Sequence, residues 1–140
     1  MYLLDTDHLS LLQRGGAASL QLSLRLFTIP DDDVAVTIVS YEEQIRGWLA
    51  PLARNQSAVS LVAGYRDLSD TMAIYCGLTV LPFDAVAAAE YERLRKLLPR
   101  LGTQDLKIAS IALANNATLL TRNRRDFEKV PTLLLDDWTI

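Results

Sequence analysis

Short apolar runs alternate with longer amphipathic segments along the chain. Tyr2–Leu4 is one such run, and VAVTIV at residues 34–39 is a longer one that is rich in β-branched side chains. Runs of this kind are typical of strands that are buried on both faces of a parallel sheet. Further candidate strands are TVLPF at 79–83, ATLLT at 117–121 and, more weakly, LLL at 133–135.

The segments between these runs have the apolar–polar spacing of helices. We expect helices at about 6–13, 17–27, 40–53, 57–75 and 85–98, and another that contains LKIASIALANN, with a turn at IPDDD. Ser40, Asp84 and Thr103 are expected to start helices as caps. Alternating strands and helices predict a three-layer α/β/α sandwich with a mostly parallel central sheet, in a single domain over residues 1–140.

The composition is that of an ordinary globular protein, with 50% hydrophobic and 22% charged residues. No apolar run has the length of a membrane span or the form of a signal peptide, so we expect no membrane association. The single Cys76 excludes an internal disulfide and, with one histidine, a Cys/His zinc site. These features favour a location in the reducing cytoplasm.

The formal charge of -3 provides no general attraction to nucleic acid, but binding depends on local patches more than on the total. The positive charge is concentrated in RNRR at 122–125 and in a second cluster between Arg93 and Arg100. Either cluster could simply be a solvated face.

Several polar residues follow the predicted strands. Asp5 comes directly after the first strand, and Glu43 lies in the first turn of the helix that follows the second. Asn123 and Asp126 come after ATLLT, and Asp105 lies at the start of the helix before it. Because ligand sites in such sheets form at the carboxyl ends of the strands, these side chains are expected to converge in one cleft.

Crowded carboxylates raise one another's pKa unless a cation neutralises them. A divalent ion such as Mg²⁺ suits an all-oxygen site, and it can activate water and stabilise the leaving oxygen of a phosphodiester. No serine or cysteine with a paired histidine is evident. Metal-assisted hydrolysis is therefore the chemistry that these residues can support.

Each acid also has a purely structural explanation. Asp5 and Asp7 could both be helix caps, and Asp7 is the better candidate for that role. Ser40 and Glu43 have the spacing of a capping box. Asp105 is favoured by the helix dipole whatever its function, and Asp126 could be a surface residue beside the arginines.

Three blocks of sequence carry a resemblance to a known family. LLDTDHLS, SYEEQIRG and TQDLKIASIALANNATLLTRNRRDF resemble, in order, the sequence blocks of PIN-domain proteins, and they are most similar to the VapC-type toxins of bacterial toxin–antitoxin pairs. The resemblance covers essentially the whole chain. It implies a ribonuclease whose acidic cluster binds Mg²⁺ or Mn²⁺ and which a small antitoxin protein inhibits.

By position, the resemblance places the catalytic acids on four residues, namely Asp5, Glu43, Asp105 and Asp126, with the first three as metal ligands. Glu42 is an alternative to Glu43. A helical wheel puts Glu42 nearer the apolar side, but we retain Glu43 because a ligand in a wet cleft need not face the core.

The chain departs from the family pattern at two positions. Many relatives have Asn in place of Asp7, and some have an acid in place of Asn123. Thr121, Asn123 and Asp7 are therefore treated as supporting residues, and a site of three acids is an open alternative. His8 is expected in a helix near the mouth of the site.

The expected partners also follow from the resemblance. They are an RNA substrate, for which tRNA is a reasonable choice, the cognate antitoxin, and a second copy of the chain in a homodimer. Phosphate contacts are expected from the residues next to the cleft, Arg122, Arg124 and Arg125. An apolar groove among the helices between residues 17 and 75 would suit an antitoxin peptide.

Two alternatives to a ribonuclease remain. One is a degenerate PIN module that binds RNA or a partner without cleaving. The other is a receiver-like phosphoacceptor domain, in which Asp84 would be the acceptor. The second lacks a lysine directly after ATLLT, where this chain has Arg122 and Asn123.

Overall fold

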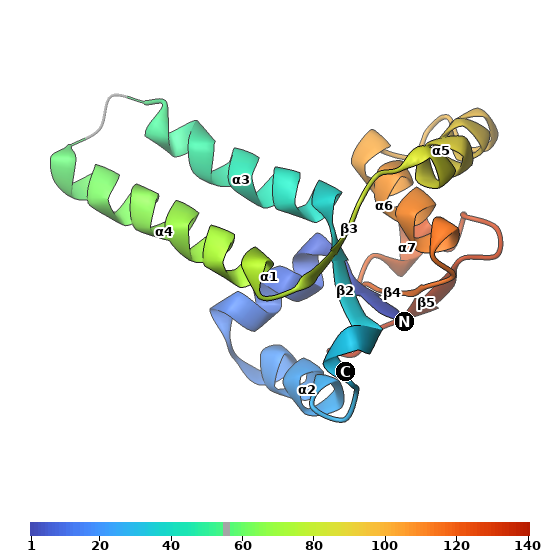
Figure 1. Ribbon diagram of the computed structural model, residues 1–140, viewed down its shortest axis with the longest axis horizontal. Coiled ribbons are helices and arrows are strands. Elements are labelled where there is room, and N and C mark those ends of the chain that lie inside the picture. Colours follow the sequence, from blue (N-terminus) through green and yellow to red (C-terminus); the bar gives the residue numbers. More distant parts are fainter. Residues whose placement is uncertain (55–56) are drawn as a thin grey trace.

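The computed structural model describes residues 1–54 and 57–140. In this part of the chain, five strands form one sheet in the order β3–β2–β1–β4–β5, and every neighbouring pair is parallel (Figure 1). The strands are β1 (Tyr2–Leu4), β2 (Val34–Thr37), β3 (Thr79–Leu81), β4 (Thr118–Leu120) and β5 (Leu134–Asp136). The first strand is therefore central, and the strand order switches direction between β1 and β4.

Helices cover both faces of this sheet. On one side lie α1 (Thr6–Arg14) and α2 (Ala17–Leu26), and on the other α5 (Ala85–Leu97), α6 (Thr103–Ala114) and the short α7 (Arg124–Phe127) (Figure 1). A single turn of 3-10 helix, Asp31–Asp33, precedes β2. No described helix combines the length and apolar composition needed to cross a membrane.

Two helices extend away from the sheet as an antiparallel pair, α3 (Ile38–Leu52) and α4 (Ala58–Cys76) (Figure 1). The indole Nε1 of Trp48 donates to Thr71 Oγ1 at 2.7 Å and ties the two helices together. The ring of Tyr41 meets that of Tyr75 edge-on at 5.0 Å where the pair joins the body of the protein. We call α3 and α4 together the helical arm.

Alternate strand residues point to opposite faces of the sheet. Leu3, Ala35 and Leu119 pack in one cluster with side chains of α5 and α6. Leu4, Val36 and Leu120 pack in a second cluster with side chains of α1, α2 and α4. The central strands β1, β2 and β4 are largely buried on both faces and are mostly apolar, and the predicted three-layer sandwich is confirmed.

Two predicted helix starts are wrong. The strand predicted at 34–39 ends at Thr37, whose Oγ1 caps α3 by accepting the backbone N–H of Ser40 at 3.0 Å. Ser40 thus lies inside the helix, and it forms no capping box with Glu43. Likewise Thr103 is the first residue of α6 and not its cap, a position that Gly102 occupies. Asp84 does cap α5, as predicted, by accepting from the Ala87 backbone N–H at 3.0 Å.

Candidate active site

Asp5 stands at the carboxyl end of the central strand and at the start of α1. Its backbone N–H donates to the Leu120 carbonyl at 3.1 Å, which continues the pairing of β1 with β4. Its Oδ1 accepts the backbone N–H of His8 at 2.7 Å, so Asp5 is the cap of α1. The prediction that Asp7 is the cap is therefore wrong. Because β1 ends at Leu4 and α1 begins at Thr6, only Asp5 occupies the capping position.

Glu43 approaches Asp5 from α3. Its Oε1 accepts the hydroxyl of Thr6 at 3.0 Å, across the gap between α1 and α3. The Thr6 hydroxyl is equally close to Ser40 Oγ, but it has one proton, and a carboxylate is the stronger acceptor. The side chain of Glu43 is thereby held beside the residue that follows Asp5.

Glu42 has different surroundings, which separate it from Glu43. Its Oε1 accepts from Gln104 Nε2 at 3.0 Å and its Oε2 accepts from Arg46 at 2.6 Å. The hydrogen bond from Gln104, with the charges of Arg46 and Lys107, lowers the pKa of Glu42. The charge of ionised Glu42 is thus already balanced by its hydrogen-bond donors. The contact with Gln104 also ties the start of α6 to α3.

Asp105 lies one residue beyond Gln104, in the first turn of α6. Burial raises the pKa of Asp105, and the charges of Asp126 and Asp5 raise it further. Burial likewise raises the pKa of Glu43; the Thr6 hydrogen bond opposes this, while the charges of Asp105, Asp5 and Glu42 add to it. Glu43 and Asp105 thus both lie near Asp5, and Asp126 lies near Asp105.

The fourth acid lies on the turn after β4. Asp126 accepts a hydrogen bond from Asn123 Nδ2 at 3.2 Å, and Lys129 Nζ lies 3.6 Å from its other oxygen. Thr121 is fully buried, and its hydroxyl accepts the backbone N–H of Asn123 at 3.0 Å. Thr121 therefore fixes the conformation of this turn by binding the Asn123 backbone, and the Asn123 side chain orients Asp126.

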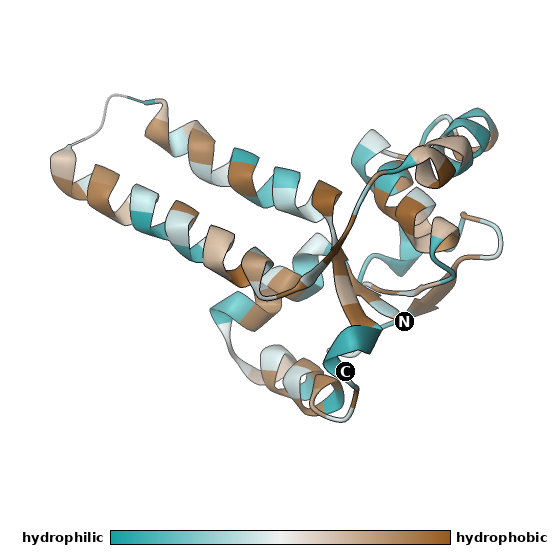
Figure 2. Ribbon diagram, viewed as in Figure 1, coloured by the Kyte–Doolittle hydropathy of each residue, from teal (hydrophilic) through white to brown (hydrophobic). Residues whose placement is uncertain are grey.

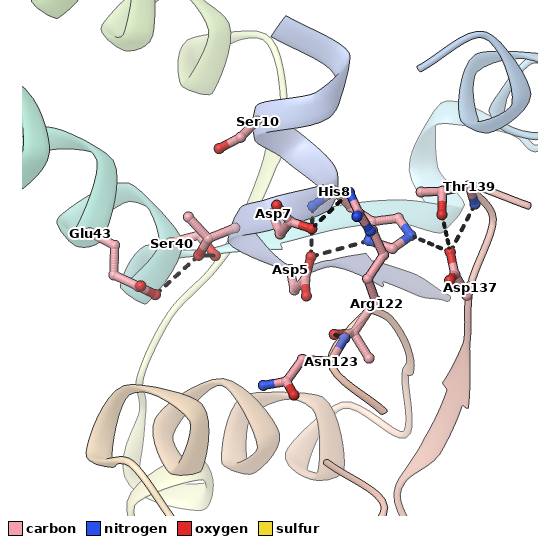
Figure 3. Close-up of polar contacts among 12 residues, drawn as sticks. Asp5, Asp7, His8, Ser10, Ser40, Glu43, Arg122, Asn123, Asp137 and Thr139 are labelled. Atoms are coloured by element: carbon pink, nitrogen blue, oxygen red, sulfur yellow. Dashed lines mark hydrogen bonds and ion pairs between the residues drawn. The ribbon is translucent and has the colours of Figure 1, made fainter. Parts of the chain in front are cut away.

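The three predicted RNA-binding arginines are all exposed beside this turn. Arg122 lies at the mouth of the site, where its Nη1 is 3.6 Å from Asp7 Oδ2 (Figure 3). Arg124 pairs with Glu128 along α7, with 3.1 Å between Nε and Oε1. Asp7, the extra acid of the first motif, thus faces an arginine on the surface.

The position of His8 differs from the prediction. Its side chain is completely buried, because the residue three positions after the cap of α1 turns toward the sheet and not toward the mouth. Its ring nitrogens face Asp5 on one side and Asp137 on the other (Figure 3). Asp137 was not predicted as a site residue, although it follows β5 much as Asp5 follows β1.

A cleft of about 680 Å³ adjoins the acids on the side of the helical arm. Thr6 and Glu43 belong to its wall, and Gln44 Nε2 donates to Ser10 Oγ across it at 3.2 Å. Trp48, Asp67 and Asp70 line its far end. Of the four predicted acids, Glu43 lines this groove between α1, α3 and α4, and the buried Asp5 lies behind Thr6.

The acids suit a hydrated divalent cation better than a closed metal cage. Within residues 1–54 and 57–140, no three or more Asp, Glu, His or Cys side chains are arranged so that together they could hold a metal ion. Mg²⁺ commonly uses one or two carboxylates and keeps several waters. The donors at this edge are oxygens. Burial, and then repulsion from the neighbouring acids, raises the pKa of Glu43 and of Asp105, and a cation would relieve the repulsion. The residues therefore fit such an ion.

The family model of the PIN domain matches residues 2–133. The chain belongs to the PIN-domain family. Two curated relatives are ribonuclease VapC2 of Rickettsia felis, 40% identical over 65 residues, and the tRNA(fMet)-specific endonuclease VapC of Salmonella typhimurium, 32% identical over 81 residues. These matches cover 44% and 55% of this PIN-domain chain, and 48% and 61% of the relatives.

Among solved structures, VapBC2 from Rickettsia felis bound to a DNA fragment from its promoter is similar over nearly the whole chain. The TM-score is 0.73 at 25% identity, over 98% of this chain and 98% of that one. The α/β arrangement of the PIN-domain chain is thus that of its relatives.

Proposed function

We propose that this PIN-domain protein is a divalent-metal-dependent endoribonuclease and the toxin of a toxin–antitoxin pair. The observation that supports the proposal is that Glu43 and Asp105 are held close to Asp5 at the carboxyl edge of the sheet. Thr6, next to Asp5, donates to Glu43, and Gln104, next to Asp105, donates to Glu42. The names of the VapC relatives support the same activity. Because the matched segments span about half of those relatives, the activity is inferred from the site and the family together.

The roles of the side chains follow from their places around the cleft. Asp5, Glu43 and Asp105 would serve a hydrated Mg²⁺ or Mn²⁺, one or two of them as direct ligands and the rest through its waters. When bound, the ion would supply an activated water and neutralise charge on the phosphate. Thr6 holds the carboxylate of Glu43 in place. Asn123 orients Asp126, whose charge acts on Asp105. The Gln104–Glu42 hydrogen bond keeps α6, and with it Asp105, against α3.

The arginines provide a surface for the RNA backbone. Arg122, Arg124 and Arg125 are exposed next to the acids, so a phosphate chain bound there would pass the cleft. With a net charge of -3 over the whole protein, this local patch is what would attract RNA. We propose a tRNA substrate, in line with the name of the Salmonella relative.

The partner surface is proposed on the helices near the arm. Apolar residues are frequent along α2 and α4 (Figure 2). The exposed apolar side chains on and next to these helices include Leu20, Leu24, Phe27, Val59, Val62, Tyr65 and Met72. Such surfaces usually mark contacts with other proteins. An antitoxin bound there would lie beside the cleft, and the VapBC complex of the structural relative supports such a pairing. A homodimer through part of this surface is the second partner that we propose.

Cleavage of mixed cellular RNA by the purified protein tests this function. The reaction would be run with Mg²⁺, with Mn²⁺ and with chelator, for wild type, Asp5→Asn and Asp84→Asn. Asp84→Asn is the matched control, because Asp84 is exposed on the edge of the sheet and Asn is an equally good helix cap.

Metal-dependent cleavage that is lost only in Asp5→Asn is the expected result. A folded Asp5→Asn protein that cleaves like wild type would contradict the proposal. RNA binding without cleavage, by a wild-type protein that takes up Mn²⁺, would favour a binding module instead.

A further inference from the structure

The completely buried His8 lies between two carboxylates. Its Nδ1 is 3.3 Å from Asp5 Oδ1 and its Nε2 is 3.5 Å from Asp137 Oδ1 (Figure 3). Both distances exceed those of good N–H···O bonds, and neither nitrogen has a well-aligned hydrogen bond among the described residues. The ring therefore spans the two acids by close polar contact at each edge.

Packing alone gives no reason for an imidazole at this position. A leucine would fill much the same space without burying two polar nitrogen atoms that lack aligned partners. His8 also sits on the face of the sheet where the neighbouring core side chains are apolar, including Leu4, Leu9 and Leu120. The presence of a polar ring is thus explained by the carboxylates that face its two nitrogens, those of Asp5 and Asp137.

Asp137, which faces Nε2 of this ring, is itself held in place by hydrogen bonds. Its Oδ1 accepts both the backbone N–H and the hydroxyl of Thr139, at 2.9 and 2.6 Å. The preceding Asp136 accepts the indole N–H of Trp138 at 2.8 Å, and the Trp138 ring packs against Tyr2 with 4.5 Å between centroids. The segment after β5 is therefore anchored to the body of the protein.

Asp5 contacts the Nδ1 edge of the ring with its carboxylate. Its Oδ1 is taken up by the backbone N–H of His8 and faces the ring, while its other oxygen points away from His8 (Figure 3). A rotation of the carboxylate would change the 3.3 Å contact between Oδ1 and the ring Nδ1. The position of the ring therefore limits the orientations that Asp5 can adopt.

We propose that His8 is a positioning residue that holds the Asp5 carboxylate in the orientation needed for metal binding and RNA cleavage. Asp137 anchors the opposite edge of the His8 ring. The inference rests on the proposed function. It adds the segment after β5 to the parts of the chain that set the geometry of the site.

Four variants separate positioning from packing. His8→Leu removes both polar contacts. His8→Asn keeps a donor close to the place of Nδ1, facing Asp5. His8→Gln keeps one close to the place of Nε2, facing Asp137. Asp137→Asn keeps an oxygen that can accept from Thr139 but removes the charge that faces His8.

Three quantities would be measured for each variant: the melting temperature, Mn²⁺ affinity by titration calorimetry, and kcat and KM on total tRNA. His8→Leu should lose roughly 10- to 100-fold in kcat and in Mn²⁺ affinity, with KM little changed, as for other residues that orient a metal ligand. His8→Asn should recover most of this loss, and His8→Gln less. Asp137→Asn should have no further effect in a His8→Leu background, because it acts through His8.

A His8→Leu protein that melts, binds Mn²⁺ and cleaves like wild type would overturn the inference. If that variant does not fold, wild-type Mn²⁺ affinity and kcat in both His8→Gln and Asp137→Asn overturn the inference, because the first removes the contact with Asp5 and the second removes the charge that anchors the ring. A wild type that binds Mn²⁺ but cleaves no RNA refutes the proposed function. The Mn²⁺ affinities of the His8 variants, compared with that of wild type, then test the positioning role by themselves. A wild type that neither binds Mn²⁺ nor cleaves overturns both.

Discussion

The hydroxyl of Thr6 donates to Glu43 across the gap between α1 and α3, with 3.0 Å between Oγ1 and Oε1. Thr6 directly follows Asp5, so two consecutive residues supply one carboxylate and the donor that orients another. This contact joins the carboxyl end of β1 to the first turns of α3. It is also the one interaction that lowers the pKa of Glu43 against burial and the neighbouring charges.

Replacement of Thr6 by Val removes this donor and keeps the shape of the side chain. The pKa of Glu43 is then raised by burial and by the charges of Asp105, Asp5 and Glu42, with no hydrogen bond from residue 6 to lower it. A smaller fraction of Glu43 is ionised at mildly acidic pH, so we expect the acid limb of the pH–rate profile to move to higher pH. The cleavage rate on total tRNA should fall by roughly 10-fold.

Thr6→Ser is the matched control, because it keeps the hydroxyl and should keep the wild-type profile. The same pH–rate profile for Thr6→Val and wild type would show that ionised Glu43 does not limit the reaction.

Removal of one crowded carboxylate should stabilise the metal-free protein at neutral pH. Burial, Asp126 and Asp5 raise the pKa of Asp105, so the folded chain binds a proton here more tightly than the unfolded chain does. The ionised group therefore destabilises the fold above its raised pKa, and this penalty disappears as the pH falls below the unfolded value of about 4. Asp105→Asn should melt a few degrees above wild type at neutral pH in chelator, and the difference should vanish in acid.

Asp84→Asn is again the control, since its charge lies outside the cluster and it should melt like wild type at both pH values. A lower melting temperature for Asp105→Asn at neutral pH would mean that the carboxylate stabilises the fold through contacts that outweigh the repulsion.

Mg²⁺ or Mn²⁺ should raise the melting temperature of wild type. A ligand that binds only the folded state stabilises it by about 2.7 kcal/mol at a hundred times its Kd, and here it would also remove the repulsion among the acids. Asp5→Asn should respond much less, because it loses one of the proposed ligands. Thermal unfolding at increasing metal concentration, with K⁺ at matched ionic strength as the control, measures this effect. Equal shifts in wild type and Asp5→Asn would place the ion elsewhere.

The central strands and the layers could be predicted because helices cover both faces of the sheet, which makes β1, β2 and β4 mostly apolar runs. The start of α3 could not, because Ile38 and Val39 continue the β-branched pattern after the strand has ended at Thr37. Val39 is buried in the same cluster as Ala35, so hydrophobicity does not mark the boundary either. Only the side chain of Thr37, which caps the helix, distinguishes the two elements.

The acidic residues at the ends of β1 and β2 and around β4 were also predictable, since the carboxyl ends of parallel strands meet at one edge. The same rule applied to β5 would have drawn attention to Asp137. The burial of His8 between two carboxylates could not be predicted, because one of them, Asp137, comes from the other end of the chain. Local sequence places His8 in the first turn of α1, but only the position of β5 beside β4 brings Asp137 to it.

Arg122 should contribute to RNA binding without contributing to stability. Its ion pair with Asp7 is long, at 3.6 Å, and both side chains are about half exposed, so it is easily exchanged for a phosphate contact. Arg122→Gln should weaken binding of total tRNA in chelator and reduce the slope of log affinity against log salt by roughly one. Arg95→Gln is the control, because Arg95 is equally exposed and ion-paired, but on α5. Equal salt slopes for wild type and Arg122→Gln would remove Arg122 from the RNA surface and leave Arg124 and Arg125 as the candidates.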